Sequence, residues 1–288
     1  MFTLKIENAK GEIFELTHDS TEYSIIGVQG LTPPPTAVNT STGGTLDGTF
    51  YNSSRVNQRN IVITIVLNGD IEGNRQRLYQ IFNIKKQCSI YFSNKNRNVQ
   101  IVGYVETLEG DLFVQREQIQ ISIICPRPYF EDLKTIYTEL AQIVRMFEFP
   151  FTIEETDPIP FSEIQEFPLC TINNGGDVET GFVMKIMITG ATRNIKIYNT
   201  TRGEFFGISN YNADWFESGD EITINSLSGT KTVTLTRSGV TTSILNQISE
   251  GSTWLKLDVG ENDFTYTAQA GADVIRIVFI STNLYGGV

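Results

Sequence analysis

The sequence predicts a mostly β protein of two domains: an N-terminal domain of β-strands with one helix, then a C-terminal antiparallel β-sandwich. The chain has 288 residues, about twice the length that one hydrophobic core usually organises. Throughout both halves, apolar residues alternate with polar ones or form short β-branched runs. Only one segment of the predicted N-terminal domain places its apolar residues at helical spacing.

The front half begins with the pattern of a β-hairpin, because residues 2–16 alternate apolar and polar side chains on both sides of Gly11. Residues 60–67 are dense in β-branched side chains, which is typical of a buried strand. Further strands are expected at 89–92, 99–106, 112–114 and 118–125. Pro126 and Pro128 end the last of them, because proline cannot donate to a β-ladder.

After residue 67 the apolar period changes from that of a strand to that of a helix. Apolar residues recur on one helical face at Leu78, Ile81 and Phe82. Asp70 or Asn74 is expected to cap the start of this helix. Lys85 and Lys86 are expected to complement the negative end of its dipole.

A second amphipathic helix is predicted over residues 131–146, where apolar residues follow the spacing i, i+3, i+4 and i+7. We therefore expect a first domain at 1–130, a connector with this helix at 131–165, and a second domain at 166–288. The charge changes over the same region. Residues 1–150 carry 14 basic and 16 acidic side chains, whereas residues 151–288 carry 8 and 17.

The segment 27–58 differs from its surroundings, since it is poor in apolar residues and rich in Gly, Pro, Ser and Thr. The sequence predicts a long loop here. Loops of this length are uncommon in compact domains and are usually functional, so we expect this one to gain order by lying on a partner.

The back half is predicted to consist of short strands separated by turns. Strands are expected at 169–173, 183–189, 194–199, 205–208, 221–225, 230–236, 255–257, 263–268 and 274–280. Turn residues recur between them at intervals of about 8–12 residues, which favours an antiparallel sandwich.

Composition excludes several classes of function. A net charge of −11 argues against a nucleic-acid-binding protein, which needs a cationic face. His18 is the one histidine, so a Ser–His–Asp or Cys–His hydrolase would depend on it alone. Cys88, Cys125 and Cys170 form no CxxC pair and resemble small buried hydrophobes. We expect no enzymatic activity and no cofactor, and neither a signal peptide nor a membrane span is visible.

Three kinds of side chain keep other functions open. The acidic residues Asp177, Asp220, Glu261 and Asp263 are candidates for a Ca²⁺ site, although no EF-hand spacing supports one. Glu154 with Glu155 is a formal candidate for a glycosidase pair, for which a solvated connector is the simpler interpretation. The aromatic residues Tyr211, Trp215 and Trp254 are candidates for stacking on sugars or on an accessory protein, against the commoner alternative of packing beneath a loop.

Four stretches, in order along nearly the whole chain, resemble the distal tail protein (Dit) family of long-tailed bacterial viruses of Gram-positive hosts. They comprise Ile26 to Pro34 with Asp47-Gly48 and Arg59 to Ile63; Asn68 to Asp70 with Arg75 to Phe82; Gly103 to Glu106 with Cys125 to Phe130; and Phe147 to Phe151 with Asn174 to Asp177, Gly260 to Asn262 and Leu284 to Val288. The second glycine of Asn174-Gly-Gly-Asp177 departs from the shorter turn expected there.

This resemblance implies a structural virion protein of the phage tail tip, assembled in the cytoplasm of the bacterial host. Its front domain is expected to be a small β-barrel or sandwich with one helix. Six copies of it are expected to assemble into a hexameric ring that joins the tail tube to the tail-tip hub. Its back domain resembles a galectin-like sandwich, which in some relatives carries receptor-binding or accessory components. The galectin-like fold alone does not imply sugar binding.

A ring is built from heterologous, closing interfaces, and the segment 27–58 is the best candidate to form one. We expect these residues at the subunit interface: Pro33, Pro34, Pro35, Asp47, Arg55 and Arg59. The alternative function is an extracellular carbohydrate-binding module, which the missing signal peptide disfavours. A glycoside hydrolase ranks third.

Overall fold

The computed structural model describes residues 2–17, 20–44, 47–114, 116–140, 143–145, 162–164, 169–209 and 215–288. The chain forms two compact units, of which unit 1 comprises Met1–Leu133 with Leu284–Val288, and unit 2 comprises Lys134–Asn283. Across the described ranges, none of the helices combines the length and apolar character that a membrane span requires. His18, Glu154, Glu155 and Tyr211, which the sequence singled out, lie outside the described residues.

The body of unit 1 is one antiparallel sheet of seven strands in the order β2-β1-β7-β8-β9-β6-β3. These strands are β1 (Thr3–Asn8), β2 (Ile13–Leu16), β3 (Tyr23–Gln29), β6 (Arg59–Leu67), β7 (Gln87–Ser93), β8 (Asn98–Gly110) and β9 (Gln118–Cys125). The predicted hairpin at 2–16 and the predicted strands at 60–67, 89–92, 99–106 and 118–125 are confirmed.

Side chains of the two edge strands of this sheet contact each other in the core. Phe14 on the edge strand β2 and Tyr23 on the edge strand β3 contact each other edge to face, with ring centroids 4.9 Å apart. Phe82 lies 5.9 Å from Phe14 and extends this aromatic cluster. The mostly β class with one α-helix among the described residues is therefore confirmed.

The helix α1 (Ile71–Ile81) forms where the apolar period changes. The Asp70 carboxylate accepts a hydrogen bond from the Gly73 N–H at 3.1 Å, so Asp70 is the N-cap. The expected role of Lys85 and Lys86 is wrong. The helix ends at Ile81, and its last turn contains no basic residue. Lys85 adopts a positive φ in the connection to β7 instead.

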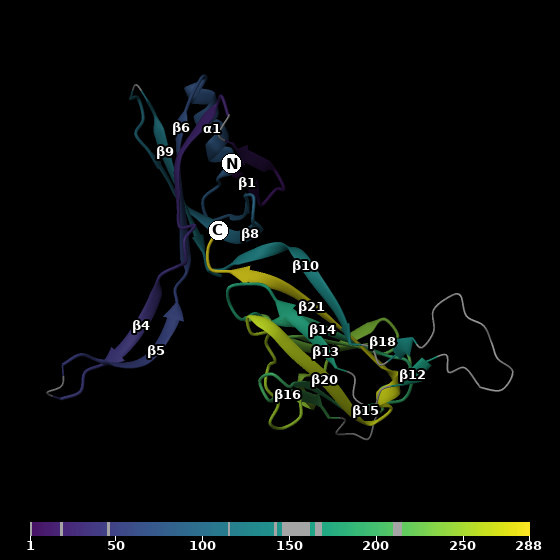
Figure 1. The fold of residues 1–288 in the computed structure, drawn as a ribbon. Coiled ribbons are helices and arrows are strands. Elements are labelled where there is room, and N and C mark those ends of the chain that lie inside the picture. The colour runs from purple at the N-terminus through teal and green to yellow at the C-terminus, as the bar shows by residue number, and fades with distance from the viewer. Residues whose placement is uncertain are drawn as a thin grey trace. The chain divides into compact units, whose positions relative to one another are not determined.

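Two further predictions for unit 1, one of a strand and one of a loop, are also wrong. Residues 112–114 form the loop between β8 and β9 rather than a strand. The predicted loop at 27–58 contains a hairpin of its own, made of β4 (Thr36–Ser41) and β5 (Phe50–Val56). This hairpin extends from the sheet of unit 1 as an arm (Figure 1). The local sequence did not indicate this hairpin, because its strands bury no side chain and so lack the apolar alternation of a strand.

The helix predicted over 131–146 is wrong as well, because the chain forms β10 (Phe130–Leu140) and β11 (Ile143–Arg145) there. The start of β10 pairs with β8, and the strand also neighbours β21 (Ile275–Tyr285). Pairing with these neighbouring strands favours a strand over a helix here. Several side chains of β10 are also β-branched, which lowers the helical preference of the segment. β11 pairs with β12 (Ser162–Ile164).

Unit 2 is an antiparallel β-sandwich, as predicted. One sheet has the order β19-β18-β17-β14-β21, and the other has the order β13-β20-β15-β16. The strands are β13 (Cys170–Asn174), β14 (Phe182–Ile188), β15 (Arg193–Asn199), β16 (Glu204–Ile208), β17 (Glu221–Asn225), β18 (Thr232–Arg237), β19 (Val240–Ser243) and β20 (Gly260–Ala270). Between the sheets, the rings of Phe182, Phe264 and Phe279 lie 4.9–5.6 Å apart. Burial of each such ring contributes roughly 1.5–3 kcal/mol.

Two details of unit 2 differ from expectation. Leu257 makes an isolated bridge to Thr180 instead of lying in a strand. The strand β19 was not predicted, and it follows β18 through a two-residue turn at Ser238 and Gly239. Both turn residues have positive φ, as the tight hairpin turn that matches the strand twist requires.

Candidate functional site

The two strands of the β4–β5 arm contain no buried residue. Every residue of the arm is at least partly exposed, and most are fully so. Its cross-strand bonds are polar, as between the Asn39 amide and the Ser53 hydroxyl at 3.0 Å. A two-stranded hairpin without a core is marginally stable in water, so this arm gains stability from any surface that covers it.

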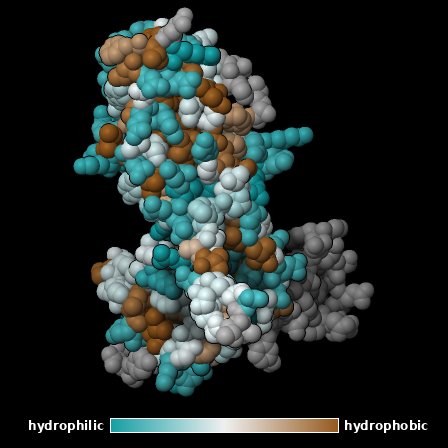
Figure 2. All heavy atoms as spheres, turned by 90° about the vertical axis from the view of Figure 1, so that its left-hand side faces the viewer, coloured by the Kyte–Doolittle hydropathy of each residue, from teal (hydrophilic) through white to brown (hydrophobic). Residues whose placement is uncertain are grey.

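Apolar side chains on the arm face solvent. Val38, Phe50 and Tyr51 are 56%, 57% and 65% exposed. Aromatic side chains supply large contact area at low entropic cost, which is why they anchor protein interfaces. Figure 2 shows apolar residues at intervals among polar ones on the face that it displays.

The six residues predicted at an interface fall into two groups. Pro33, Pro35, Asp47 and Arg55 are exposed on the arm or at its base, and Pro34 is half-buried. Their place in an interface stays a prediction. Arg59 is different, because its side chain is only 1% exposed within its own chain.

Arg59 lies at the start of β6 and binds backbone oxygens from three segments. Its Nε donates to the Pro128 carbonyl at 2.6 Å, and its Nη1 donates to the carbonyls of Gly30 and of Thr32, the latter at 2.7 Å. Its Nη2 donates to the Gly286 carbonyl at 2.5 Å.

The charge of Arg59 is compensated without a carboxylate. Its guanidinium lies 4.4 Å from the centre of the Phe130 ring, which adds a cation–π contact. Burial lowers the pKa of this guanidinium, which still remains protonated at any ordinary pH. Within the described residues no ion pair involves Arg59, so the carbonyl dipoles and the ring stabilise its charge. Arg59 therefore acts inside its own protomer.

A second exposed feature of unit 1 is the loop between β8 and β9. Phe113 adopts a positive φ of 63° and is 89% exposed. Its N–H donates to the Glu117 carboxylate at 2.9 Å, and Arg75 on α1 donates to the same carboxylate at 3.1 and 3.2 Å. Glu117 and Arg75 are both buried, so this loop is held from beneath by an ion pair. Sequence analysis did not predict this arrangement.

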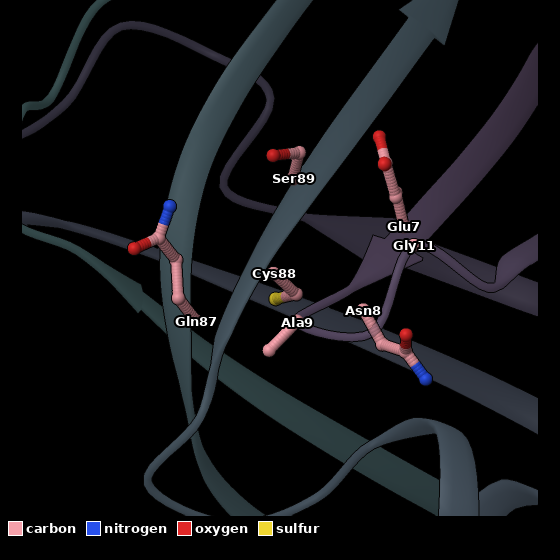
Figure 3. Close-up of a pocket in the computed structure, with 7 residues that line it drawn as sticks. All are labelled: Glu7, Asn8, Ala9, Gly11, Gln87, Cys88 and Ser89. Carbon is pink, nitrogen blue, oxygen red and sulfur yellow. The ribbon is translucent and has the colours of Figure 1, made fainter.

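A shallow polar pocket of about 320 Å³ lies between the β1–β2 turn and the start of β7 (Figure 3). Glu7, Asn8 and Gln87 contribute polar groups, and Cys88 contributes a thiol. Burial raises the pKa of the Cys88 thiol to about 11. A thiol nucleophile needs the opposite shift, so this pocket holds no activated cysteine.

Two of the four acidic residues considered for a Ca²⁺ site, Asp220 and Asp263, make hydrogen bonds within unit 2. Burial acts to raise the pKa of Asp220, but Arg237 and the Glu217 N–H hold that pKa below its ordinary value. Asp263 accepts a hydrogen bond from the Thr171 hydroxyl at 2.6 Å. No group of three His, Cys, Asp or Glu side chains in the described ranges is placed to hold a metal ion.

The two tryptophans of unit 2 are each covered by a cation. Arg193 lies 4.7 Å from the centre of the exposed Trp215 ring. Trp254 packs against Phe206, with ring centroids 5.2 Å apart, and Lys231 lies 5.3 Å from its ring centre. These contacts fit packing better than an open platform for sugars.

Comparisons with known proteins give a consistent result. Residues 10–125 match the model of a phage tail protein RIFT-related domain, and residues 175–280 match that of the C-terminal domain of a siphovirus-type tail component. A search of curated proteins finds no match.

A solved structure with a similar fold covers nearly the whole chain. The crystal structure of SPP1 Dit (gp 19.1), described as a paradigm of the hub adsorption apparatus in phages that infect Gram-positive hosts, is 13% identical, with a TM-score of 0.66. The match covers 98% of this chain and 99% of that one. The phage P2 baseplate in its activated conformation gives a TM-score of 0.48 at 11% identity, covering 98% of both chains.

Proposed function

This chain belongs to the distal tail (Dit) family of siphovirus-type phages, and we propose that six copies form a ring that joins the tail tube to the tail-tip hub. Membership in this family makes it a structural component of the phage tail and baseplate. We place its assembly in the cytoplasm of the bacterial host and its final position at the tail tip of the virion.

The observation that carries the ring proposal is the β4–β5 arm. Three apolar side chains of the arm face solvent on a hairpin that has no core of its own. In a heterologous, closing interface each copy buries its arm on the next copy. When the last copy binds the first in the same way, the copies form a ring. The near-neutral charge of residues 1–150 supports this proposal, because a strongly charged interface would repel its own copies.

Oligomeric state in solution tests the proposal. Sedimentation velocity with negative-stain imaging of the purified full chain should show a ring with six times the mass of the monomer. The variant Phe50→Ser should weaken assembly, because it removes an aromatic side chain that is 57% exposed in the monomer. Val240→Ser is the control, because Val240 is also an exposed apolar residue, at 64%, but lies on β19 of unit 2.

A second variant removes the arm without disturbing the sheet. The Asn57 N–H donates to the Pro35 carbonyl at 3.0 Å, so these two residues already face each other across the base of the arm. An Asn-Gly turn can therefore replace residues 36–56. A stable ring formed by this shortened chain would contradict the role of the arm. A full-length chain that stays monomeric at high concentration would contradict the ring itself.

We also propose that unit 2 offers the attachment surface for receptor-binding or accessory proteins. Residues 151–288 carry 8 basic and 17 acidic side chains, which suits a solvent-facing part better than a self-association interface. Cross-linking mass spectrometry of the ring with the phage adhesion proteins tests this. Cross-links should form at Lys185, Lys196 and Lys256, and a pattern confined to Lys5 and Lys10 of unit 1 would contradict it.

A further inference from the structure

The arm joins the sheet of unit 1 through a neck of two short segments. The entrance runs from Gly30 to Pro35 and the exit from Asn57 to Arg59. Residues 31–35 belong to no strand, and prolines 33 to 35 have no N–H to donate to one. The direction of the arm therefore depends on what binds the remaining backbone groups of the neck.

Three consecutive carbonyls of the entrance accept hydrogen bonds from outside the arm. Arg59 donates to the carbonyls of Gly30 and Thr32, as described above. Between them, the Leu31 carbonyl accepts from the Val288 N–H at 3.1 Å. The entrance is thus held by the exit of the arm on one side and by the segment 284–288 on the other.

The segment 284–288, here called the clasp, lies in unit 1 and is fastened at four further points. The Gly286 carbonyl accepts from Arg59 at 2.5 Å, and the Gly287 carbonyl accepts from Arg97. The Arg97 guanidinium lies 4.3 Å from the centre of the Tyr285 ring. The hydroxyl of the same tyrosine donates to the Asp132 carboxylate at 3.0 Å.

The clasp also fits closely against the neck. A methyl group built on Gly287 would lie 3.0 Å from the Leu31 carbonyl oxygen and 3.1 Å from a ring carbon of Pro33. The same group on Gly286 would lie 3.9 Å from its nearest neighbour, which is ordinary contact. Leu31, Tyr285 and Val288 pack against the core of unit 1.

We propose that the clasp, fastened by Arg59 and Arg97, sets the direction of the β4–β5 arm and thereby makes the arm competent to bind a second copy of the chain. Arg59 is a positioning residue in this arrangement, because it acts on the arm through the backbone of the neck. The part of the proposal that concerns a second copy rests on the proposed ring.

The direction of the arm is measurable in the monomer. Spin labels at Ser53 on the arm and at Lys10 in the β1–β2 turn, in a Cys170→Ser background, report one distance distribution within unit 1 by pulsed electron spin resonance. Both positions are exposed, and the remaining cysteines are buried. Deletion of residues 286–288 should broaden this distribution about twofold, because the entrance loses a hydrogen bond and a packing surface.

Assembly gives the second measurement. The same deletion should raise the concentration needed for half-assembly about tenfold, which corresponds to the loss of one typical hydrogen bond from the oriented arm. Gly287→Ala should shift both measurements in the same direction, since its methyl group presses on the neck. Gly286→Ala is the matched control and should leave both unchanged. The thermal transition of each variant shows whether unit 1 remains folded.

The results of these two measurements distinguish the role of the clasp from the formation of the ring. A Ser53–Lys10 distribution that stays equally narrow in the folded deletion variant and in Gly287→Ala overturns the clasp, whatever the oligomeric state. An unchanged assembly midpoint with a broadened distribution overturns the link between arm direction and binding. A wild-type chain that never assembles overturns the proposed ring, while the distance measurement still decides whether the clasp directs the arm.

Discussion

Gly30, at the entrance of the neck, is the position where one added methyl group should do the most damage. Its φ is +83°, and a Cβ atom there would lie 2.0 Å from the Asn60 carbonyl oxygen and 3.1 Å from the Ile61 Cα. Both contacts involve the backbone of β6, a buried strand paired on both sides. Gly30→Ala therefore requires β6 or the neck to move.

Gly11, in the β1–β2 turn, is the matched control. Its φ is +81°, but a Cβ atom there would have no neighbour within 4 Å. Gly30→Ala and Gly11→Ala share the cost of a left-handed alanine, about 1–2 kcal/mol. Only Gly30→Ala adds overpacking of about 1–3 kcal/mol.

The two variants should differ clearly in the free energy of unfolding. Gly30→Ala is expected to lose about 3–5 kcal/mol, since strained Arg59 hydrogen bonds contribute as well, and Gly11→Ala about 1–2 kcal/mol. For a unit of this size, these losses lower the melting temperature by about 6–20 °C and about 2–8 °C.

Calorimetry of the full chain measures the transition of unit 1. Both tryptophans, Trp215 and Trp254, lie in unit 2, so tryptophan fluorescence follows that unit separately and should not change in either variant. Equal destabilisation by Gly30→Ala and Gly11→Ala would refute the close approach of Gly30 to β6.

Three further predictions concern buried charges and thiols. Asp220→Asn should destabilise unit 2 at pH 7. The Asp220 pKa lies below its ordinary value, so its contribution is present above about pH 4 and is lost as the pH falls through the folded pKa. Fluorescence-detected unfolding should show the difference between the variant and wild type shrinking as the pH falls below about 4, and a constant difference would contradict the ion pair. Glu117→Gln should cost unit 1 about 2–3 kcal/mol in urea unfolding, because Arg75 loses a buried carboxylate; an unchanged midpoint would contradict this. Burial raises the pKa of Cys88 to about 11 and that of Cys125 to about 12, so both thiols should react with a disulfide reagent at pH 8 only after unfolding. Rapid reaction of either thiol in the folded chain would contradict its burial.

Much of the fold could be predicted locally, because strands and helices carry their period in the sequence. Residues 60–67 form a buried strand, as their many β-branched side chains predicted. Asp70 caps α1 because an aspartate before a helical apolar period satisfies the first free N–H groups. The strands of the unit 2 sandwich were predicted except that Leu257 makes only an isolated bridge and that β19, a strand of four exposed residues, was missed.

The errors arose where non-local contacts outweigh local pattern. Residues 130–140 have helical spacing, but β8 and β21 offer unpaired edges, and pairing with them outweighs the weak helical preference. The β4–β5 arm has no apolar alternation to reveal it, because nothing in its own chain covers it.

The sequence by itself determined the β class, the capped helix α1 and the residues around which a candidate site was sought. It also supplied the family resemblance, which the matching models bear out. Only the tertiary structure decided what those residues do. An arginine is usually a surface residue, and the sequence alone suggested that Arg59 contacts a partner. Arg59 is buried instead, and it donates four hydrogen bonds to carbonyls of three segments far apart in the chain. The return of residues 284–288 to unit 1 has no local signal either. Burial of a charge depends on where distant backbone carbonyls meet, and a pattern of neighbouring residues does not carry that information.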